Sequence, residues 1–509
     1  MLRGYAVPDV RAAEDRARAG LPEGELMQRA ARGLAEVVAD RAGQLRPGPR
    51  AARVVVLAGP GDNGGDALWA AALLARTDGT VVDLAVVGVA PRLHADGLAA
   101  ARDAGVPVHE VAPDATDLPD EVARLTGSAD LVVDGLLGIG GRPGLRGAMA
   151  LLVDAVPPTA YLVSADLPSG ADPEGRERPA QSVLADETVT FGMLKPVHLL
   201  PAGEPAVGRL TVVDIGVAMD VEPTVERLEH ADVAGLWPVP MATDHKYTRG
   251  VLGVVAGSET YPGAAVLTTT AAVAAGAGMV RYLGPPRPTD LVLAACPEVV
   301  PGPGRVQAVV VGPGIEVPTG ERTDPDDHQV ETARRFFADE VPLVVDAGGL
   351  DLLVTWMGQG HRRPAPTLLL PHAGELARMV TALDGGAATG TSREDVEDDP
   401  LGHARRVAEG TDCTVLLKGA TTLVVDPDPG APARSQADAP AWLATAGAGD
   451  VLAGLAGVLL AAGLTPRDAG SLAALVHGVA ADRANPGGPV RALAVAHAIP
   501  AAVAHLLRR

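Results

Sequence analysis

Short runs of apolar, often β-branched residues recur along the chain, and each is followed by a glycine-rich turn and an alanine- and leucine-rich segment. Such runs occur at Arg53–Leu57, Leu131–Val133, Val251–Val255, Ala308–Val311 and Val415–Leu417. Apolar strands without polar alternation are typical of parallel sheets that helices cover on both faces. The alternation of strands and helices therefore predicts an α/β fold, and the runs are too numerous for one small sheet.

Residues 216–244 interrupt this pattern, because they contain several prolines and no strong strand. A strand followed by a glycine-rich turn resumes immediately afterwards. We therefore expect a first domain at residues 1–220, a linker at 221–240 and a second domain at 241–509.

Composition narrows the classes of function. The 509 residues carry a formal net charge of −21, which disfavours nucleic acid and anionic membranes as partners. The 2 cysteines form no CxxC motif, so neither a disulfide framework nor a zinc site is expected. The first residues lack the apolar core of a secretory signal, and no apolar run is long enough to span a bilayer. A cytoplasmic protein is expected.

Lysine is rare in this chain. It occurs only at Lys195, Lys246 and Lys418, so the other 39 of the 42 basic residues are arginine (42 − 3). An ammonium group is a compact, titratable point charge that a guanidinium cannot replace. The three lysines are either remnants without a role or residues kept for such chemistry, and each falls within a motif.

The first motif, RVVVLAGPGDNGGD, spans residues 53–66. A strand is predicted to end at Leu57, and a helix is predicted to start near Asp66 after a glycine-rich loop. Free backbone N–H groups beside a helix N-terminus form an anion site, with phosphate or pyrophosphate as the expected ligand. The motif is neither GxGxxG nor a P-loop, and a turn rich in glycine for steric reasons is the alternative.

Three further loops follow predicted strands in the first half. They carry Asp134, then Asp166 with Ser169, then Lys195. The carboxyl ends of parallel strands meet at one edge of a sheet, where ligands bind. Asp166 and Lys195 are candidates for an acid–base pair, and Asn63, Asp134 and Ser169 offer oxygen ligands to a cation. For each aspartate taken alone, helix capping is the simpler interpretation.

In the second half, TAGAGDVLAG at residues 445–454 places Gly447, Ala448 and Gly449 before a helix predicted to open at Asp450. Free N–H groups and a helix dipole at this point suit a developing phosphate charge. Asp450 would then take a proton from a substrate hydroxyl. The alternative is an ordinary aspartate in a first helical turn.

Two more strand ends in the second half carry charged groups. Lys418 lies in VLLKGATT, where its ammonium could neutralise nucleotide phosphates. His372 and Glu375 lie in LLLPHAGELARM, between a strand and a helix. His372 is either a ligand contact or a capping residue.

Taken in order, GDNGGD, VDGLLGIG, DLPSG and FGMLKP make most of residues 1–220 resemble the YjeF N-terminal domain, the NAD(P)H-hydrate epimerase. The resemblance implies a Rossmann-like α/β sandwich, a K⁺ ion held by Asn63, Asp134 and Ser169, and catalysis by Asp166 and Lys195. The substrate-binding residues that it implies are Asp62, Asn63, Gly64, Gly65, Asp66, Gly138, Ile139, Gly140, Gly141, Arg142 and Gly144. The chain departs from the family pattern at Asp62 and Ala67.

Residues 240–509 resemble the ribokinase-like, ADP-dependent NAD(P)H-hydrate dehydratase through HKYTRG, VVDAGGL, PHAGE, KGATT and GAGDVLAG. The resemblance implies Mg²⁺ bound with ADP and the base Asp450. It implies substrate contacts at Ala264, Gly314 and His372. The implied nucleotide contacts are Lys418, Gly419, Ala420, Thr421, Thr422 and Gly449. Gly348 and Glu316 depart from the family pattern.

Together the two resemblances imply a bifunctional repair enzyme that epimerises hydrated NADH and NADPH (NADHX and NADPHX) and dehydrates the S epimer with ADP. A homo-oligomer is expected. Two alternatives stay open. A ribokinase-like kinase of a vitamin alcohol would explain GAGD and KGATT but leave the first domain unused. A non-catalytic nucleotide-binding protein would not need Asp450, Lys418 or Lys195.

Overall fold

The computed structural model describes residues 1–508 except 46–50, 78–81, 90–92, 317–326 and 387–389. The chain divides into an N-terminal unit, Arg3–Val225, and a C-terminal unit made of Met1–Leu2 and Glu226–Arg509. The division falls inside the predicted linker at 221–240. The remainder of that segment supplies most of β9 (Val225–Arg227) and all of α7 (Val233–Leu236) to the C-terminal unit.

The N-terminal unit contains a seven-stranded parallel sheet in the order β4-β3-β2-β5-β6-β7-β8. The chain starts the sheet at β2, extends it through β3 and β4, and then returns to place β5 on the other side of β2. Ligands of open α/β sheets bind at this switch point. The strands are β2 (Ala52–Ala58), β3 (Val82–Val89), β4 (Val108–Val111), β5 (Leu131–Gly135), β6 (Tyr161–Ala165), β7 (Glu187–Phe191) and β8 (Arg209–Val213).

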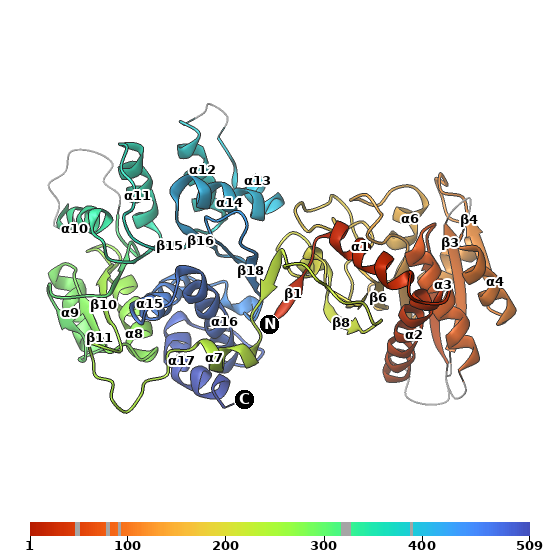
Figure 1. The fold of residues 1–509 in the computed structure, drawn as a ribbon, viewed down its shortest axis with the longest axis horizontal. Helices are drawn as coiled ribbons and strands as arrows, with labels where there is room; N and C mark the ends of the chain where they lie inside the picture. Colours follow the sequence, from red (N-terminus) through yellow and green to blue (C-terminus); the bar gives the residue numbers. More distant parts are fainter. Residues whose placement is uncertain (46–50, 78–81, 90–92, 317–326, 387–389, 509) are drawn as a thin grey trace. The chain divides into compact units, whose positions relative to one another are not determined.

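Helices cover both faces of this sheet, so the predicted α/β sandwich is confirmed (Figure 1). Alternate residues of β2 enter different cores, since Val54 and Val56 pack in one cluster and Val55 and Leu57 in the other. The helices are α1 (Val7–Arg18), α2 (Glu25–Leu45), α3 (Asp62–Arg76), α4 (Ala95–Asp103), α5 (Asp120–Gly127) and α6 (Ala148–Asp154).

The sheet of the C-terminal unit runs in the order β9-β18-β17-β16-β15-β14-β13-β10-β11-β12. Strands β10 to β16 are parallel, and β17 and β18 are antiparallel, as the hairpin that follows Lys418 requires. The strands are β10 (Val251–Val255), β11 (Met279–Tyr282), β12 (Val300–Pro301), β13 (Ala308–Val311), β14 (Leu343–Val345), β15 (Thr367–Leu369), β16 (Thr414–Leu417), β17 (Thr422–Val425) and β18 (Ala433–Gln436).

Apolar helices bury one face of this sheet. Helix α15 (Ala448–Ala461) is almost entirely buried and packs against α8 (Pro262–Ala274), α16 (Pro466–Ala484) and the centre of the sheet. The remaining long helices of the unit are α9 (Pro286–Ala295), α10 (Asp327–Ala338), α11 (Gly348–Gly358), α12 (Ala373–Leu383), α14 (Pro400–Thr411) and α17 (Ala492–Leu506). The position of α15 places its N-terminus at the carboxyl edge of the strands.

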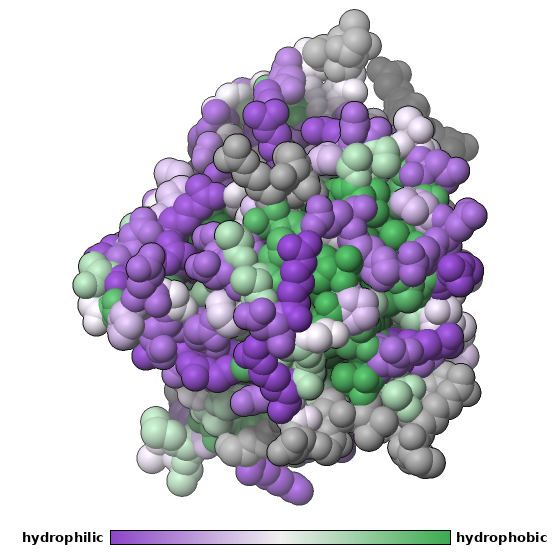
Figure 2. All heavy atoms as spheres, turned by 90° about the vertical axis from the view of Figure 1, so that its right-hand side faces the viewer, coloured by the Kyte–Doolittle hydropathy of each residue, from purple (hydrophilic) through white to green (hydrophobic). Residues whose placement is uncertain are grey.

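The surface mixes polar and apolar side chains. Figure 2 shows one face, on which hydrophilic residues surround a central hydrophobic area. Among the described helices, none combines the length and the hydropathy that crossing a membrane would require.

Candidate active sites

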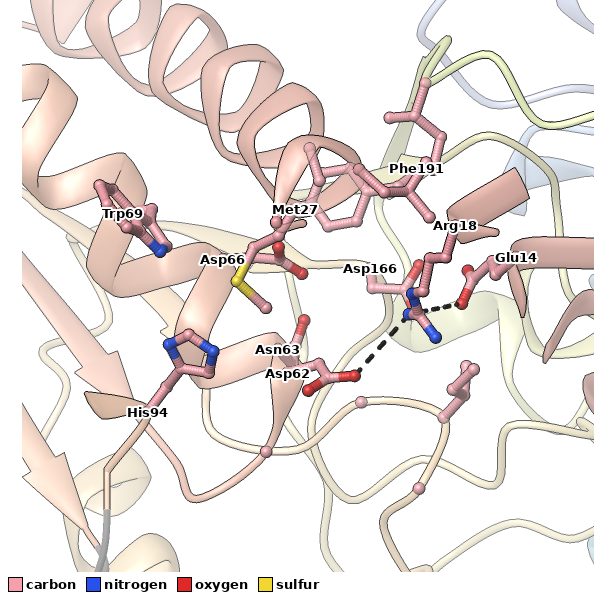
Figure 3. Close-up of a pocket in the computed structure, with 18 of the residues that line it drawn as sticks. Glu14, Arg18, Met27, Asp62, Asn63, Asp66, Trp69, His94, Asp166 and Phe191 are labelled. Carbon is pink, nitrogen blue, oxygen red and sulfur yellow. Dashed lines mark hydrogen bonds and ion pairs between the residues drawn. The ribbon is translucent and has the colours of Figure 1, made fainter. Parts of the chain in front are cut away.

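A cavity of about 1210 Å³ opens at the switch point of the N-terminal sheet (Figure 3). The start of α3 contributes Asp62, Asn63 and Asp66 to its wall, and the loop after β5 contributes residues 138–141. Asp166 lies in the wall at the end of β6. The sequence-predicted residues Arg142 and Gly144 lie outside the described lining of the cavity.

The predicted start of α3 is wrong by one turn. The helix begins at Asp62, so Gly64 and Gly65 are helical residues and do not belong to a loop. A Cβ atom at Gly64 would lie 2.1 Å from the carbonyl oxygen of Gly59, so close packing explains this glycine. Gly61 gives the helix no side-chain cap, which leaves the first amides of α3 directed at the cavity edge.

Asp166 and Lys195 form a buried ion pair. The Lys195 side chain is 1% exposed, and its Nζ contacts Asp166 Oδ1 and donates to Thr190 Oγ1 at 3.0 Å. Asp166 has a φ of 63°, a left-handed conformation that is strained for a residue with a side chain. Its amide donates to the Val189 carbonyl at 2.7 Å, which helps to hold this geometry. The predicted acid–base pair is thus brought together at the cavity.

The sequence did not predict a role for His198, whose ring bonds to the backbone of Asp166. The Lys195 amide donates to His198 Nδ1 at 3.0 Å, so the neutral ring carries its proton on Nε2. Nε2 then donates to the Asp166 carbonyl oxygen at 2.8 Å. Burial, with the nearby Lys195 charge, lowers the pKa of His198 to about 4. Its spacing of three residues from Lys195 was the available signal.

This histidine should make the N-terminal unit less stable in acid. The unfolded imidazole titrates near its ordinary pKa of 6.5, so the stabilisation is fully present above pH 6.5 and is lost as the pH falls towards 4. The loss amounts to about 3 kcal/mol in the free energy of unfolding. Hydrogen exchange of peptides around Asp166 should therefore accelerate between pH 6.5 and 4, after correction for intrinsic exchange.

Hydrogen exchange must be measured peptide by peptide, because a second histidine would also destabilise the protein in acid. Burial lowers the pKa of His477, in the C-terminal unit, to about 4 as well. In His198→Gln the side chain still donates and accepts but does not titrate, so the acid-dependent acceleration should disappear near Asp166. Persistence of the acceleration in this variant would contradict the assignment.

The predicted oxygen ligands converge around the loop after β5. Asp134 is fully buried at the end of β5 and accepts from Ser169 Oγ at 2.5 Å and from Ser164 Oγ at 2.9 Å. Asn63 Nδ2 donates to the Leu137 carbonyl at 3.0 Å, and the Leu137 amide donates to Ser169 Oγ at 2.8 Å. Asn63 Oδ1 is buried and makes no hydrogen bond with the described residues.

Helix α1 supplies a wall of the cavity that the sequence did not predict. Arg18 Nη2 lies 3.4 Å from Glu14 Oε2 and 3.8 Å from Asp62 Oδ2, as the dashed lines in Figure 3 mark. Burial raises the pKa of Glu14, as does the Asp166 charge, while Lys195 opposes the shift. Arg18 thus offsets the carboxylate that Asp62 places at the first position of α3.

In the C-terminal unit, Asp450 lies in the first turn of α15, which begins at Ala448, two residues before the predicted start. Gly447 has a φ of 85° and caps the helix. By helix geometry, the amides of Gly449 and Asp450 have no intrahelical acceptor. Burial and the neighbouring Asp346 charge raise the pKa of Asp450 to about 7, with Lys418 opposing. This is the range in which a general base works at neutral pH.

Lys418 is engaged by carboxylates. Its Nζ lies 2.6 Å from Asp346 Oδ1 and 3.6 Å from Glu375 Oε2. Although burial opposes it, the charges of Asp346 and Glu375 raise the pKa of Lys418. The sequence did not predict these partners, although Asp346 directly follows β14 in VVDAGGL. The ammonium is thereby fixed beside Gly449, whose Cβ position would lie 3.5 Å from Nζ.

His372 takes the capping role that the sequence left open. Its Nδ1 accepts from the amides of Gly374 at 3.1 Å and Glu375 at 3.3 Å, and Glu375 Oε2 accepts from the His372 amide at 2.8 Å. About half of the side chain stays exposed, so a ligand contact through Nε2 remains a prediction.

The other predicted contacts of this half lie at neighbouring loops. Gly314 has a φ of 67°, and a Cβ there would lie 2.6 Å from Ala264 Cβ, so these two residues face each other. Gly419 and Ala420 form an exposed turn after β16, Thr421 is buried and Thr422 begins β17.

The departures from the family pattern are accommodated locally. Ala67 is fully buried, and its methyl occupies space that a side chain at Gly135 would need, since a Cβ there would lie 2.5 Å away. A Cβ at Gly348 would lie 2.1 Å from the Ile315 carbonyl oxygen, so no side chain fits there. Glu316 is exposed.

Comparison with protein families gives two matches. A model described as the YjeF-related protein N-terminus matches residues 23–197, and a model described as NAD(P)H-hydrate dehydratase matches residues 252–499. The two matched regions fall in the two structural units.

Curated relatives match across both units. The bifunctional NAD(P)H-hydrate repair enzyme Nnr of Mycobacterium leprae is 42% identical over 497 residues, covering 96% of this chain and 95% of its own. Its counterpart in Mycobacterium tuberculosis is 43% identical over 477 residues, with 92% and 91% covered. The Escherichia coli enzyme of the same name is 32% identical over 453 residues, with 85% and 81% covered.

Proposed function

Because the chain belongs to the family of bifunctional NAD(P)H-hydrate repair enzymes, we propose that its two units catalyse successive steps in the repair of NADHX and NADPHX. The N-terminal unit interconverts the R and S epimers at C6. The C-terminal unit dehydrates the S epimer with ADP, which yields reduced cofactor, AMP and phosphate. The observation that supports this division best is the presence of one Asp–Lys pair at each ligand-binding edge, buried in the N-terminal unit and partly buried in the C-terminal unit.

In the epimerase site the Asp166 carboxylate accepts the proton of the C6 hydroxyl. The Lys195 ammonium contacts that carboxylate at the cavity wall, and His198 fixes its backbone. The first amides of α3 bind the pyrophosphate of the substrate, with the helix dipole favouring its negative charge. The loop at residues 138–141 also lines the cavity.

A K⁺ ion fits the predicted oxygen ligands of this unit. The buried, unpartnered Asn63 Oδ1 lies beside the loop that Ser169 and Asp134 hold in place. Oxygen atoms of this kind are the donors that hard cations prefer. The ion would supply positive charge next to the phosphate-binding amides, and Asn63, Asp134 and Ser169 would hold it.

Potassium should therefore stimulate epimerisation, and Asn63→Ala should reduce that stimulation at least about tenfold because one ligand is lost. The measurement compares epimerisation rates in KCl and in choline chloride at equal ionic strength. K⁺ should also raise the melting temperature of the wild-type protein, since a bound ion stabilises the folded state.

The matched control is Asn485→Ala, which removes an exposed asparagine of the C-terminal unit. This variant should keep both the stimulation and the thermal shift. Equal rates and equal melting temperatures in the two salts would contradict the K⁺ site.

In the dehydratase site Asp450 removes the proton of the C6 hydroxyl, and the oxygen attacks the terminal phosphorus of ADP, releasing AMP. The amides of Gly449 and Asp450 and the Lys418 ammonium stabilise the charge that develops on the transferred group. The C6–O bond then breaks with the help of the N1 lone pair, and phosphate leaves. Loss of a proton from C5 restores the 5,6 double bond.

We propose that Mg²⁺ enters this site on the phosphates of ADP. The described residues hold no cluster of three or more His, Cys, Asp or Glu side chains that could bind a metal. Mg²⁺ is commonly bound by one or two carboxylates together with substrate phosphates. Asp346, which contacts Lys418, and Asp450, in the first turn of α15, are the candidate carboxylates. Lys418, Gly419, Ala420, Thr421 and Thr422 are proposed to contact the nucleotide.

The test is the stoichiometry of the nucleotide products. Incubation of the S epimer with ADP should release one AMP and one phosphate per reduced cofactor formed. A stable phosphorylated organic product without reduced cofactor would instead favour the small-molecule kinase, and no nucleotide turnover would favour a non-catalytic binding protein.

A further inference from the structure

Asp66 presents a buried carboxyl group to the epimerase cavity. Its residue is 9% exposed, and it lines the cavity with Asp166 (Figure 3). Within the described part of the chain, its side chain makes no hydrogen bond and no ion pair. Burying such a group without a partner costs free energy, so its position indicates a role toward a ligand.

The side-chain carboxyl, and not the backbone amide, is the group of Asp66 that can bond to the substrate. Helix α3 begins at Asp62, so the Asp66 amide is the donor of the regular bond to the Asp62 carbonyl. The free amides of the helix are those of the residues before Gly65, whose amide donates to the Gly61 carbonyl at 3.1 Å. An ionised carboxyl would repel the substrate's phosphates, whereas a protonated one can donate.

The surroundings of Asp66 favour its neutral form. Burial raises its pKa well above the usual range, and the charges of Asp166, Asp62 and Glu14 add to the shift, while Arg18 opposes it. The cavity wall also carries His94, whose Nδ1 accepts from the Gly97 amide, and the charged side chains of Arg11, Asp15, Glu23 and Asp96. Asp166 differs from Asp66 because it has Lys195 as a direct cationic partner.

We propose that Asp66 is the catalytic acid of the epimerisation and works opposite Asp166, the base. The proposal rests on the proposed epimerase activity. In the ring-opening route, Asp166 takes the C6 hydroxyl proton while the C6–N1 bond breaks. The bonding electron pair moves to N1, which receives the proton of Asp66, and C6 becomes an aldehyde carbon.

Rotation about the C5–C6 bond then presents the other face of the aldehyde to N1. Closure reverses both transfers, so that N1 returns its proton to Asp66 and Asp166 protonates the new hydroxyl. No co-reactant is consumed. Two carboxyl groups in different protonation states within one site are a common arrangement for such paired proton transfers.

The test is Asp66→Asn, which preserves size and hydrogen-bond donation but cannot transfer a proton. The kcat for epimerisation should fall about 10²- to 10⁴-fold, with KM changed less than about threefold. Wild-type kcat should also fall as the pH rises through the Asp66 pKa, because the protonated form of Asp66 is lost. This decrease of kcat at high pH should be absent from the variant. Asp103→Asn, which removes an exposed carboxylate of α4 outside the described lining of the cavity, should behave as wild type.

A second readout does not depend on activity. Infrared difference spectroscopy of the wild-type protein at neutral pH should show a protonated carboxyl band that Asp66→Asn lacks. A kcat within about threefold of wild type, or the absence of this band, would overturn the proposal. If the wild-type protein itself fails to epimerise, the proposed function fails, and the infrared band alone then decides whether Asp66 is protonated.

Discussion

Replacing Asp450 by asparagine should reduce the kcat for dehydration about 10²- to 10⁴-fold, because the variant cannot accept the hydroxyl proton. The partly buried position beside Asp346, which raises the Asp450 pKa to about 7, makes the carboxyl a base suited to neutral pH. The wild-type rate should rise with pH through about 7, since the ionised form is the reactive one. Absorbance of the reduced nicotinamide, with pure S epimer and ADP, measures this directly.

The same chain supplies the control, because Asp450→Asn should leave epimerisation by the N-terminal unit unchanged. Asp482 is an exposed aspartate on α16. Asp482→Asn makes the same chemical change away from the site and should retain dehydration. Dehydration by Asp450→Asn within about threefold of wild type, or a flat pH profile for the wild-type enzyme, would show that another group is the base.

Replacing Lys195 by methionine should abolish epimerisation and destabilise the N-terminal unit. The Lys195 ammonium is buried and bonded to Asp166 and to Thr190 Oγ1, so its removal leaves a buried carboxylate without its cation. Breaking such a pair costs about 3–5 kcal/mol in the free energy of unfolding. Urea unfolding, followed by hydrogen exchange of N-terminal peptides, measures this loss, and chiral analysis of the hydrates measures epimerisation.

Lys246→Met is the matched control, since it removes another of the three lysines, at an exposed position in the C-terminal unit. It should change neither the urea midpoint of the N-terminal peptides nor the rate of epimerisation. An unaltered midpoint for Lys195→Met would mean that the buried pair does not stabilise this unit, and unaltered epimerisation would remove Lys195 from the mechanism.

The parts of the sites that could be predicted are those set by strand ends. Asp134 and Asp166 follow apolar runs, and parallel strands carry such residues to one edge, so local pattern sufficed to group them. Asp450 was predictable for a similar reason, because small residues before an apolar helical segment mark a helix N-terminus.

The errors have a common physical cause, which is close packing in three dimensions, both within a loop and between distant segments. Gly64 was interpreted as a loop residue, yet it lies in helix α3. The nearby Gly59 carbonyl leaves no room for a side chain at this position. The carboxylate partners of Lys418 and the wall formed by α1 also arise from tertiary contacts. Residue spacing carries no information on these contacts.

The backbone conformation of Asp166 and the tautomer of His198 could not be predicted from the sequence either. Asp166 has a φ of 63°, and its contacts with Val189 and His198 help to hold it there. The predicted oligomeric state, the K⁺ site and the preference for ADP stay predictions.

The most direct test of the central claim is the recovery of reduced cofactor from a mixture of R and S hydrates, followed by nicotinamide absorbance with the intact chain, ADP, Mg²⁺ and K⁺. If both units work as proposed, absorbance rises until all of the hydrate has been converted, at a rate above that of spontaneous epimerisation. A rise that stops when the S epimer is exhausted, or no rise at all, would contradict the claim that one chain carries both activities.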